Sequence, residues 1–298
     1  MTTIIRSPFQ HLPVKKYSKI LVRFVLLWVT LNGCYTPRYV YSPSAHNVPV
    51  LSAKGDSKLA VNYSSNGGGN RWRESFVQAR SNGADIQGAY AFHKNWAVQS
   101  SFFTRNERNG GDYSNTDSAV IRYKRRLVDA GIGYYKSLHP KGDVYFQVFA
   151  GMGAGKFSFT DNGRDDANTI YSRFHEANII RFYIQPALQV QYRKLIAASF
   201  SSRFSFTDFR NIQTNYASVE LENYALQTLG NGAVVFWEPA FINSFGTKKI
   251  PGLQLEYQLG FSMLMSRRFI DARTFNFSIG LQSDLGILLK KKGSPSKK

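Results

Sequence analysis

The chain has 298 residues, of which 38 are Lys or Arg and 19 are Asp or Glu, so its formal net charge is +19. A single cysteine excludes a disulfide framework and a cysteine-based zinc cluster, and an aromatic content of 15% is too high for a disordered chain. The mean hydropathy of −0.30 excludes a bundle of membrane-spanning helices, each of which needs about 20 apolar residues.

The basic excess is concentrated partly at the two ends of the chain. Five Lys or Arg residues with no acidic neighbour precede Cys34, and five lysines lie in 290–298. A nucleic-acid-binding surface instead clusters its basic residues on one face and interleaves aromatic side chains. We therefore expect no nucleic-acid partner, and we expect 290–298 to be a disordered basic tail.

Residues 1–33 have the pattern of an export signal. A basic segment precedes an apolar run over 24–31, which is too short to span a bilayer as a helix and has the size of a secretory h-region. The sequence then reads Leu-Asn-Gly-Cys, which resembles a bacterial lipobox. The resemblance implies that the signal is cut just before Cys34 and that this cysteine is acylated. The alternative is an ordinary signal peptide followed by a bystander cysteine.

Residues 34–56 form a lead-in that is rich in proline and aromatic side chains. Its three prolines are Pro37, Pro43 and Pro49, and prolines at this density oppose a helix. We expect an extended segment that packs against or into the domain that follows.

The body of the chain, 57–289, alternates between apolar and polar residues with a period of two. In 253–263, for example, Leu255 and Leu259 share one face and Glu256 and Gln258 share the other. Ten segments show this alternation: 57–65, 84–92, 95–104, 119–136, 144–155, 180–190, 196–206, 232–241, 253–263 and 275–284.

The lengths of the predicted strands and of their connections indicate a membrane barrel. Many of the strands reach the 9–11 residues that a transmembrane strand needs. Long polar loops alternate with tight turns, as in outer-membrane barrels. The predicted long loops are 66–83, 105–118, 160–176 and 207–231, and the predicted tight turns are 93–95, 137–142 and 191–194.

We therefore predict an all-β fold, a closed antiparallel up-and-down transmembrane β-barrel of about ten strands, with eight to twelve possible. Closure is required because hydrocarbon cannot hydrogen-bond an unpaired strand edge. An even strand number places both termini on the short-turn side, the periplasm, where a lipid on Cys34 would enter the inner leaflet of the outer membrane.

At this point the chain resembles the small outer-membrane β-barrel lipoproteins of Gram-negative bacteria. The resemblance rests on the lipobox-like residues, the lead-in and the alternating strands. It implies a lipid-anchored protein of the cell outer membrane. Its partners would be outer-membrane lipids and lipopolysaccharide, together with the barrel-assembly and lipoprotein-sorting machinery. One departure is the end of the chain, where Leu288 and Leu289 precede lysines and no terminal aromatic residue is present.

The candidate site is a polar network in the lumen. Two arginines share the inward parity with several carboxylates, and unpaired buried charges are costly, so these groups should pair or be hydrated. The network comprises Arg181, Arg203, Asp129, Glu238, Glu256 and Asp284, with Asp85 on the same parity. It either fills a narrow barrel or forms a charged constriction in a pore; we favour filling because ten strands enclose little space.

Other motifs give weaker signals. The glycine-rich stretch 150–157 has Ala150 and Phe157 where a phosphate loop needs Gly and Ser or Thr, so its glycines are expected to make room in the lumen. Asp161 and its neighbours in 160–166 do not have the spacing of a calcium loop. His175 is the histidine nearest the outer rim, where lipid A-modifying barrel enzymes place a His and a Ser. We expect no metal site and no cofactor.

Arginines of the long loops could contact the phosphates of lipopolysaccharide through charge-assisted hydrogen bonds, or could simply be solvated. They are Arg71, Arg73, Arg80, Arg105, Arg108, Arg267, Arg268 and Arg273.

The predicted function is a structural, binding or narrow-pore role without catalysis. Two alternatives remain open, a soluble periplasmic β-sandwich lipoprotein that binds a ligand and an outer-membrane barrel enzyme that modifies lipid A. A sandwich would have shorter strands and less asymmetric loops.

Overall fold

A computed structural model describes residues 37–68, 80–112, 118–140, 142–164, 167–193 and 195–286. The predicted signal peptide, Cys34, Arg71, Arg73 and the basic tail lie outside these residues. Within them, no helix has the length and apolar character needed to cross a membrane.

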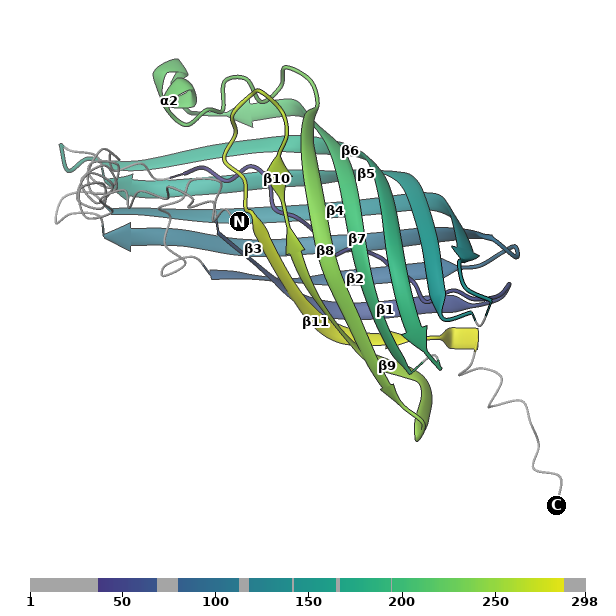
Figure 1. The fold of residues 1–298 in the computed structure, drawn as a ribbon. Coiled ribbons are helices and arrows are strands. Elements are labelled where there is room, and N and C mark those ends of the chain that lie inside the picture. The colour runs from purple at the N-terminus through teal and green to yellow at the C-terminus, as the bar shows by residue number, and fades with distance from the viewer. Residues whose placement is uncertain are drawn as a thin grey trace, which may run out of the picture. The chain divides into compact units, whose positions relative to one another are not determined.

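Ten long strands form one closed antiparallel sheet, which confirms the predicted barrel (Figure 1). Each strand from β1 to β8 pairs with the next; β9 then pairs with β8, and β11 closes the ring between β9 and β1. The strands are β1 Ser57–Gly67, β2 Arg80–Tyr90, β3 Trp96–Asp112, β4 Ser118–Ser137, β5 Val144–Arg164, β6 Ile170–Tyr192, β7 Ile196–Thr214, β8 Val234–Thr247, β9 Ile250–Phe261 and β11 Phe275–Ser283. The two-residue β10, Met263–Leu264, continues β9 alongside β8. The closed ring rules out the alternative of a β-sandwich.

The two ends of the barrel differ. The short-turn end carries the turns 91–95, 138–143 and 248–249, and β1 begins and β11 ends there. The opposite end, which we call the long-loop end, carries the 215–233 loop with the short helix α2, Ser218–Asn223.

The outward-facing residues of the barrel wall are apolar over a broad band. Large apolar side chains are exposed on many of the strands, with exposed fractions of 53% for Val61, 55% for Val128, 56% for Met152 and 52% for Phe182. The polar parity of the same strands faces inward and is buried. The apolar residues of the predicted alternation thus face outward from the closed wall, and the polar residues face the lumen.

Beyond this band, toward the long-loop end, the two faces exchange character. On β4 the outward residues become Arg122 and Lys124, while the inward residue Tyr123 is fully buried against Phe159. Because we had assigned apolar residues to the outside, four predicted strands have one end where this exchange begins: 95–104, 144–155, 180–190 and 196–206. The predicted strand 119–136, in contrast, runs through the exchange. The predicted loop boundaries are therefore wrong: β3 to β7 have 17, 20, 21, 23 and 19 residues and extend into the predicted loops 105–118, 160–176 and 207–231.

The N-terminal segment, residues 37–56, runs through the lumen from one end of the barrel to the other. Every residue of 37–49 is buried. At the long-loop end, Arg38 forms an ion pair with Asp161 near the end of β5. At the short-turn end, Leu51 packs with Tyr135 and Phe149, and the Gly55 amide donates to the Ala91 carbonyl over 2.8 Å.

This path separates the first described residue from the start of the sheet, while the two chain ends themselves lie outside the described residues. The ends of β1 and β11 do lie together, since the Ser57 hydroxyl contacts the Asp284 carboxylate at 3.5 Å. Pro37, however, lies at the opposite, long-loop end. An even number of strands fixes where the sheet begins and ends, but a segment that precedes the sheet can return through the lumen.

Candidate functional site

The interior of the barrel is a polar network built from inward-facing strand residues and from the N-terminal segment. Its centre is Glu238 of β8, which lies directly opposite Arg203 of β7. The Arg203 Nε donates to Glu238 Oε2 over 2.7 Å, and Ser205 donates to the same oxygen over 2.6 Å. The Tyr41 hydroxyl of the N-terminal segment donates to Oε1 over 2.7 Å. Buried, charge-assisted bonds of this kind hold the segment to the wall.

A second ion pair joins strands that are not neighbours. Arg181 of β6 reaches Asp129 of β4 with two nitrogens, and its Nε lies 3.2 Å from Asp129 Oδ1. Between them, in register with both, is Gly153 of β5. A Cβ on Gly153 would collide with the Asp129 carboxylate, so the glycine makes room for this bidentate pair.

Both arginines also contact Ser44 in the N-terminal segment. Arg203 Nη2 donates to the Ser44 carbonyl over 3.0 Å, and Arg181 Nη1 contacts its hydroxyl over 3.2 Å. His46 lies nearby, with its Nδ1 3.0 Å from the Ser201 hydroxyl. Hydrogen bonds therefore hold the middle of the N-terminal segment to the barrel wall, in addition to the contacts at its two ends.

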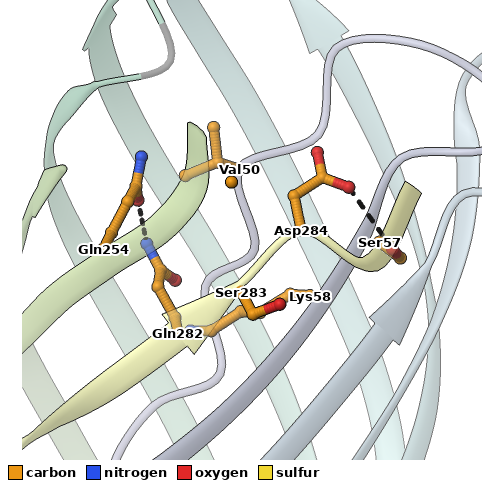
Figure 2. Close-up of a pocket in the computed structure, with 8 residues that line it drawn as sticks. Val50, Ser57, Lys58, Gln254, Gln282, Ser283 and Asp284 are labelled. Atoms are coloured by element: carbon orange, nitrogen blue, oxygen red, sulfur yellow. Dashed lines mark hydrogen bonds between the residues drawn. The ribbon is translucent and has the colours of Figure 1, made fainter. Parts of the chain in front are cut away.

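The structure brings four of the six predicted network residues together in these two pairs. Glu256 lies elsewhere in the lumen, where it accepts from Lys58 over 2.7 Å and from Asn62 over 3.3 Å. Asp284 lies at the short-turn end, where the Ser57 hydroxyl is 3.5 Å from its carboxylate (Figure 2).

Further buried ion pairs lie closer to the long-loop end, and the sequence reasoning missed them. Glu107 is bound by Arg125 over 2.6 Å and by Arg273 over 3.0 Å. Arg105 is bound to Asp85 over 2.8 Å. We had predicted that Arg105 and Arg273 lie in loops at the membrane surface. Both predictions are wrong, because the two side chains are buried inside the barrel.

Asp161, taken as a solvated loop residue, is also buried in its ion pair with Arg38. The signal for these inward strand residues was the continued alternation with aromatic neighbours such as Tyr123 and Phe157.

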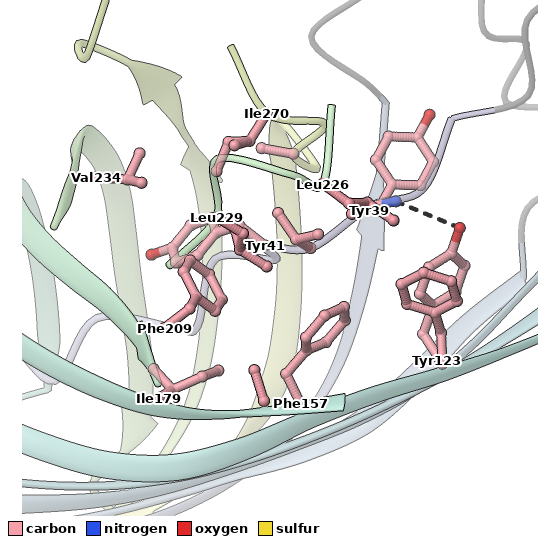
Figure 3. Packing of buried hydrophobic residues seen from close by; sticks show 14 of the residues in the cluster. Tyr39, Tyr41, Tyr123, Phe157, Ile179, Phe209, Leu226, Leu229, Val234 and Ile270 are labelled. Atoms are coloured by element: carbon pink, nitrogen blue, oxygen red, sulfur yellow. Dashed lines mark hydrogen bonds between the residues drawn. The ribbon is translucent and has the colours of Figure 1, made fainter. Parts of the chain in front are cut away.

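An aromatic cluster closes the lumen around the first residues of the N-terminal segment (Figure 3). The Tyr39 amide donates to the Tyr123 hydroxyl over 3.4 Å, and the Arg273 guanidinium lies 3.7 Å from the centre of the Tyr39 ring. Tyr41 stacks on Phe236 with ring centres 3.8 Å apart. Large rings and stacked cations fill this end of the barrel.

Two small cavities lie beside the N-terminal segment. One of about 30 Å³ is lined by Val50, Lys58, Gln254 and Gln282 near the short-turn end (Figure 2), and one of about 20 Å³ lies beside Val40 and Ser42. Each has room for about one water molecule.

His175 lies inside the barrel wall, stacked on Phe159 with ring centres 5.5 Å apart, and neither of its ring nitrogens has a hydrogen-bond partner among the described residues. It does not face the lipid side of the wall. Among all the residues that the structure describes, no cluster of three or more His, Cys, Asp or Glu side chains could hold a metal ion.

No protein-family model and no curated protein matches this chain. Among solved structures, it is similar to the outer membrane protease OmpT from Escherichia coli, at 11% identity and a TM-score of 0.38 over 77% of this chain and 94% of that one. It is also similar to the translocator domain of the autotransporter NalP from Neisseria meningitidis, at 9% identity and a TM-score of 0.41 over 90% of this chain and 95% of that one. A third similar structure is Ail of Yersinia pestis, at 14% identity and a TM-score of 0.32 over 77% of this chain and 98% of that one. The barrel assignment rests on the strand pairing of the chain itself.

Proposed function

We propose that this protein is an outer-membrane β-barrel that its own N-terminal segment closes, with a structural or binding role at the cell surface and neither solute passage nor catalysis. The observation that carries the proposal is the burial of every residue of 37–49 along the lumen. A segment held by buried ion pairs and hydrogen bonds along its length leaves no continuous aqueous path.

The apolar band supports a place in the outer membrane. On β6 the outward residues are apolar from Ile180 to Tyr192. Twelve residue steps, at about 3.3 Å each and a strand tilt of about 40°, cross about 30 Å. This height matches an outer-membrane band of about 25 Å flanked by aromatic side chains. Trp96 and Tyr134, whose ring centres are 5.6 Å apart, would belong to the girdle at the short-turn end.

The N-terminal segment gives the proposal a direction. Short turns of outer-membrane barrels face the periplasm, so the long-loop end, and Pro37 with it, would face the outside. Only three residue steps separate Pro37 from Cys34, a reach of about 10 Å when fully extended. If Cys34 is acylated, as the lipobox-like sequence indicates, its lipid would enter the outer leaflet, in contrast to our expectation from the strand number alone.

Conductance in planar lipid bilayers tests the closed lumen. The full chain is expected to show no steady channels, and a variant lacking 37–50 is expected to conduct. The folding of both proteins is checked by heat-modifiable migration on gels. A steadily conducting full chain, or a folded but non-conducting deletion variant, would contradict the proposal.

Surface labelling tests the direction of the chain. An epitope inserted between Thr36 and Pro37 should bind antibody on intact cells, whereas the same epitope inserted between Lys248 and Lys249 should bind only after the outer membrane is opened. The reverse pattern would overturn the orientation. Metabolic labelling with a fatty acid should mark the natural chain and fail to mark the Cys34→Ser variant; equal labelling of both would refute acylation at this residue.

A further inference from the structure

The outward wall carries a group of cations directly beyond the apolar band, which we call the basic face. All six side chains are exposed, and they lie on adjacent strands at the long-loop end. The basic face consists of Arg80 on β2, Arg108 on β3, Arg122, Lys124 and Arg126 on β4, and Lys156 on β5.

The strand register places these cations directly opposite one another. Arg80 pairs with Arg108, and Arg108 pairs with Arg122, so three arginines form one row across β2, β3 and β4. Arg126 pairs with Lys156 in a second row. Like charges at directly opposite positions destabilise an antiparallel sheet, so this arrangement is unfavourable without a bound anion.

Acidic side chains of the described residues do not neutralise the basic face. None of its six cations forms an ion pair there. The nearby Arg210 of β7 is paired with Asp208 on its own strand, at 2.7 Å. The neighbouring strand β6 offers one exposed carboxylate, Glu176, which lies opposite Ser158 rather than opposite a cation. Among the residues that the structure describes, the basic face therefore keeps an excess of positive charge.

Its position along the strands indicates what kind of anion it meets. On β4, Arg126 is followed on the same outward face by Val128, which is 55% exposed; on β5, Lys156 follows Ala154 and the 56% exposed Met152. A molecule that covers both the cations and the adjoining apolar wall needs anionic groups joined directly to acyl chains. A soluble nucleic acid or an acidic peptide has no part that matches the apolar wall.

We propose that the basic face binds the phosphate groups of an outer-leaflet glycolipid of the lipopolysaccharide class, whose acyl chains lie against the band below. The arginines donate charge-assisted hydrogen bonds to the phosphate oxygens, and the lysines act as point charges. Binding offsets the repulsion between the opposed cations. This inference rests on the proposed outer-membrane location with the long-loop end outside.

Binding of purified lipid A to the folded full chain in detergent tests the inference. The variant Arg122→Gln, Lys124→Gln, Arg126→Gln, Lys156→Gln removes four cations of the basic face. A matched control removes four exposed lysines at the short-turn end, through Lys94→Gln, Lys136→Gln, Lys248→Gln and Lys249→Gln. Native mass spectrometry counts retained bis-phosphorylated lipid A, with dephosphorylated lipid A and inorganic phosphate as the other probes.

The natural chain and the control are expected to retain bis-phosphorylated lipid A, and the basic-face variant should bind it at least about tenfold more weakly. Dephosphorylated lipid A should bind all three proteins equally and weakly, and inorganic phosphate should not displace the lipid. Added lipid A should raise the melting temperature of the natural chain but not that of the variant. Equal retention by the variant and the control, or displacement by inorganic phosphate, would overturn the inference.

Insertion into phospholipid vesicles is measured for the same proteins by protection from protease. A natural chain that does not insert contradicts the proposed outer-membrane location itself. A chain that inserts, but whose lipid A binding does not depend on the basic face, contradicts this inference alone.

Discussion

The substitution Arg203→Ala is expected to destabilise the barrel without opening it. The side chain bonds to Glu238 over 2.7 Å and to the Ser44 carbonyl over 3.0 Å, and both partners are buried. Removing one member of a buried ion pair costs about 3–5 kcal/mol, because the other charge is left uncompensated. Glu238 keeps its bonds from Ser205 and Tyr41, so we expect the lower part of this range, about 3 kcal/mol, in the free energy of unfolding.

Two comparisons separate the loss of the ion pair from other effects. Arg210→Ala removes an exposed arginine of the same strand, whose pair with Asp208 is at the surface, and should cost less than about 1 kcal/mol. The double variant Arg203→Met, Glu238→Gln removes both charges of the buried pair, so it should be less destabilised than Arg203→Ala.

Denaturant unfolding in detergent micelles, followed by the change in gel migration, gives the free energy of unfolding of each variant. Single-channel recording of the same proteins gives their conductance. We expect Arg203→Ala to lower the unfolding midpoint and to leave the conductance at the level of the natural chain. A large rise in conductance with an unchanged midpoint would show that Arg203 belongs to a pore constriction, and the argument for a filled lumen would then fail.

Three further substitutions follow from the same structure. Leu51→Ala leaves a cavity in the apolar cluster at the short-turn end and should lower the free energy of unfolding by about 2–5 kcal/mol, measured by denaturant titration. Gly153→Ala places a methyl group on the Asp129 carboxylate and should cost about 1–3 kcal/mol in the same titration, whereas a change below experimental error would contradict the close approach. In α2, burial acts to raise the pKa of Glu220, but the backbone amide at the start of the helix and the Arg173 guanidinium outweigh it and hold this pKa below its ordinary value of 4.5. Its stabilisation of α2 is therefore present above pH 4.5 and is lost as the pH falls through the lowered pKa. The protection of the helix amides against hydrogen exchange, corrected for the intrinsic exchange rate at each pH, should fall on acidification in the natural chain. In the Glu220→Gln variant this corrected protection should not change over the same pH range.

The sequence determined the wall of this barrel. A strand turns alternate side chains to opposite faces, so the period of two in segments such as 253–263 identified the strands, their number and the face that each residue occupies. This information is local, and Glu256 needed no distant contact to be assigned to the lumen. The same reasoning failed near Arg105 and Phe157, because beyond the apolar band the outward residues are polar and the aromatic residues face inward.

The tertiary structure alone decided what fills the lumen. Composition predicted that 34–56 would be extended and would pack with the domain, but its direction through the barrel depends on contacts such as Arg38 with Asp161, which lie 123 residues apart in the chain. Likewise, the alternation of residues predicted that Arg181 and Asp129 face the lumen. Their pairing, however, depends on the register of β4, β5 and β6 and on the absence of a side chain at Gly153. Alternation along a strand specifies a face, whereas the partner on that face is fixed by strands and segments that are distant in sequence.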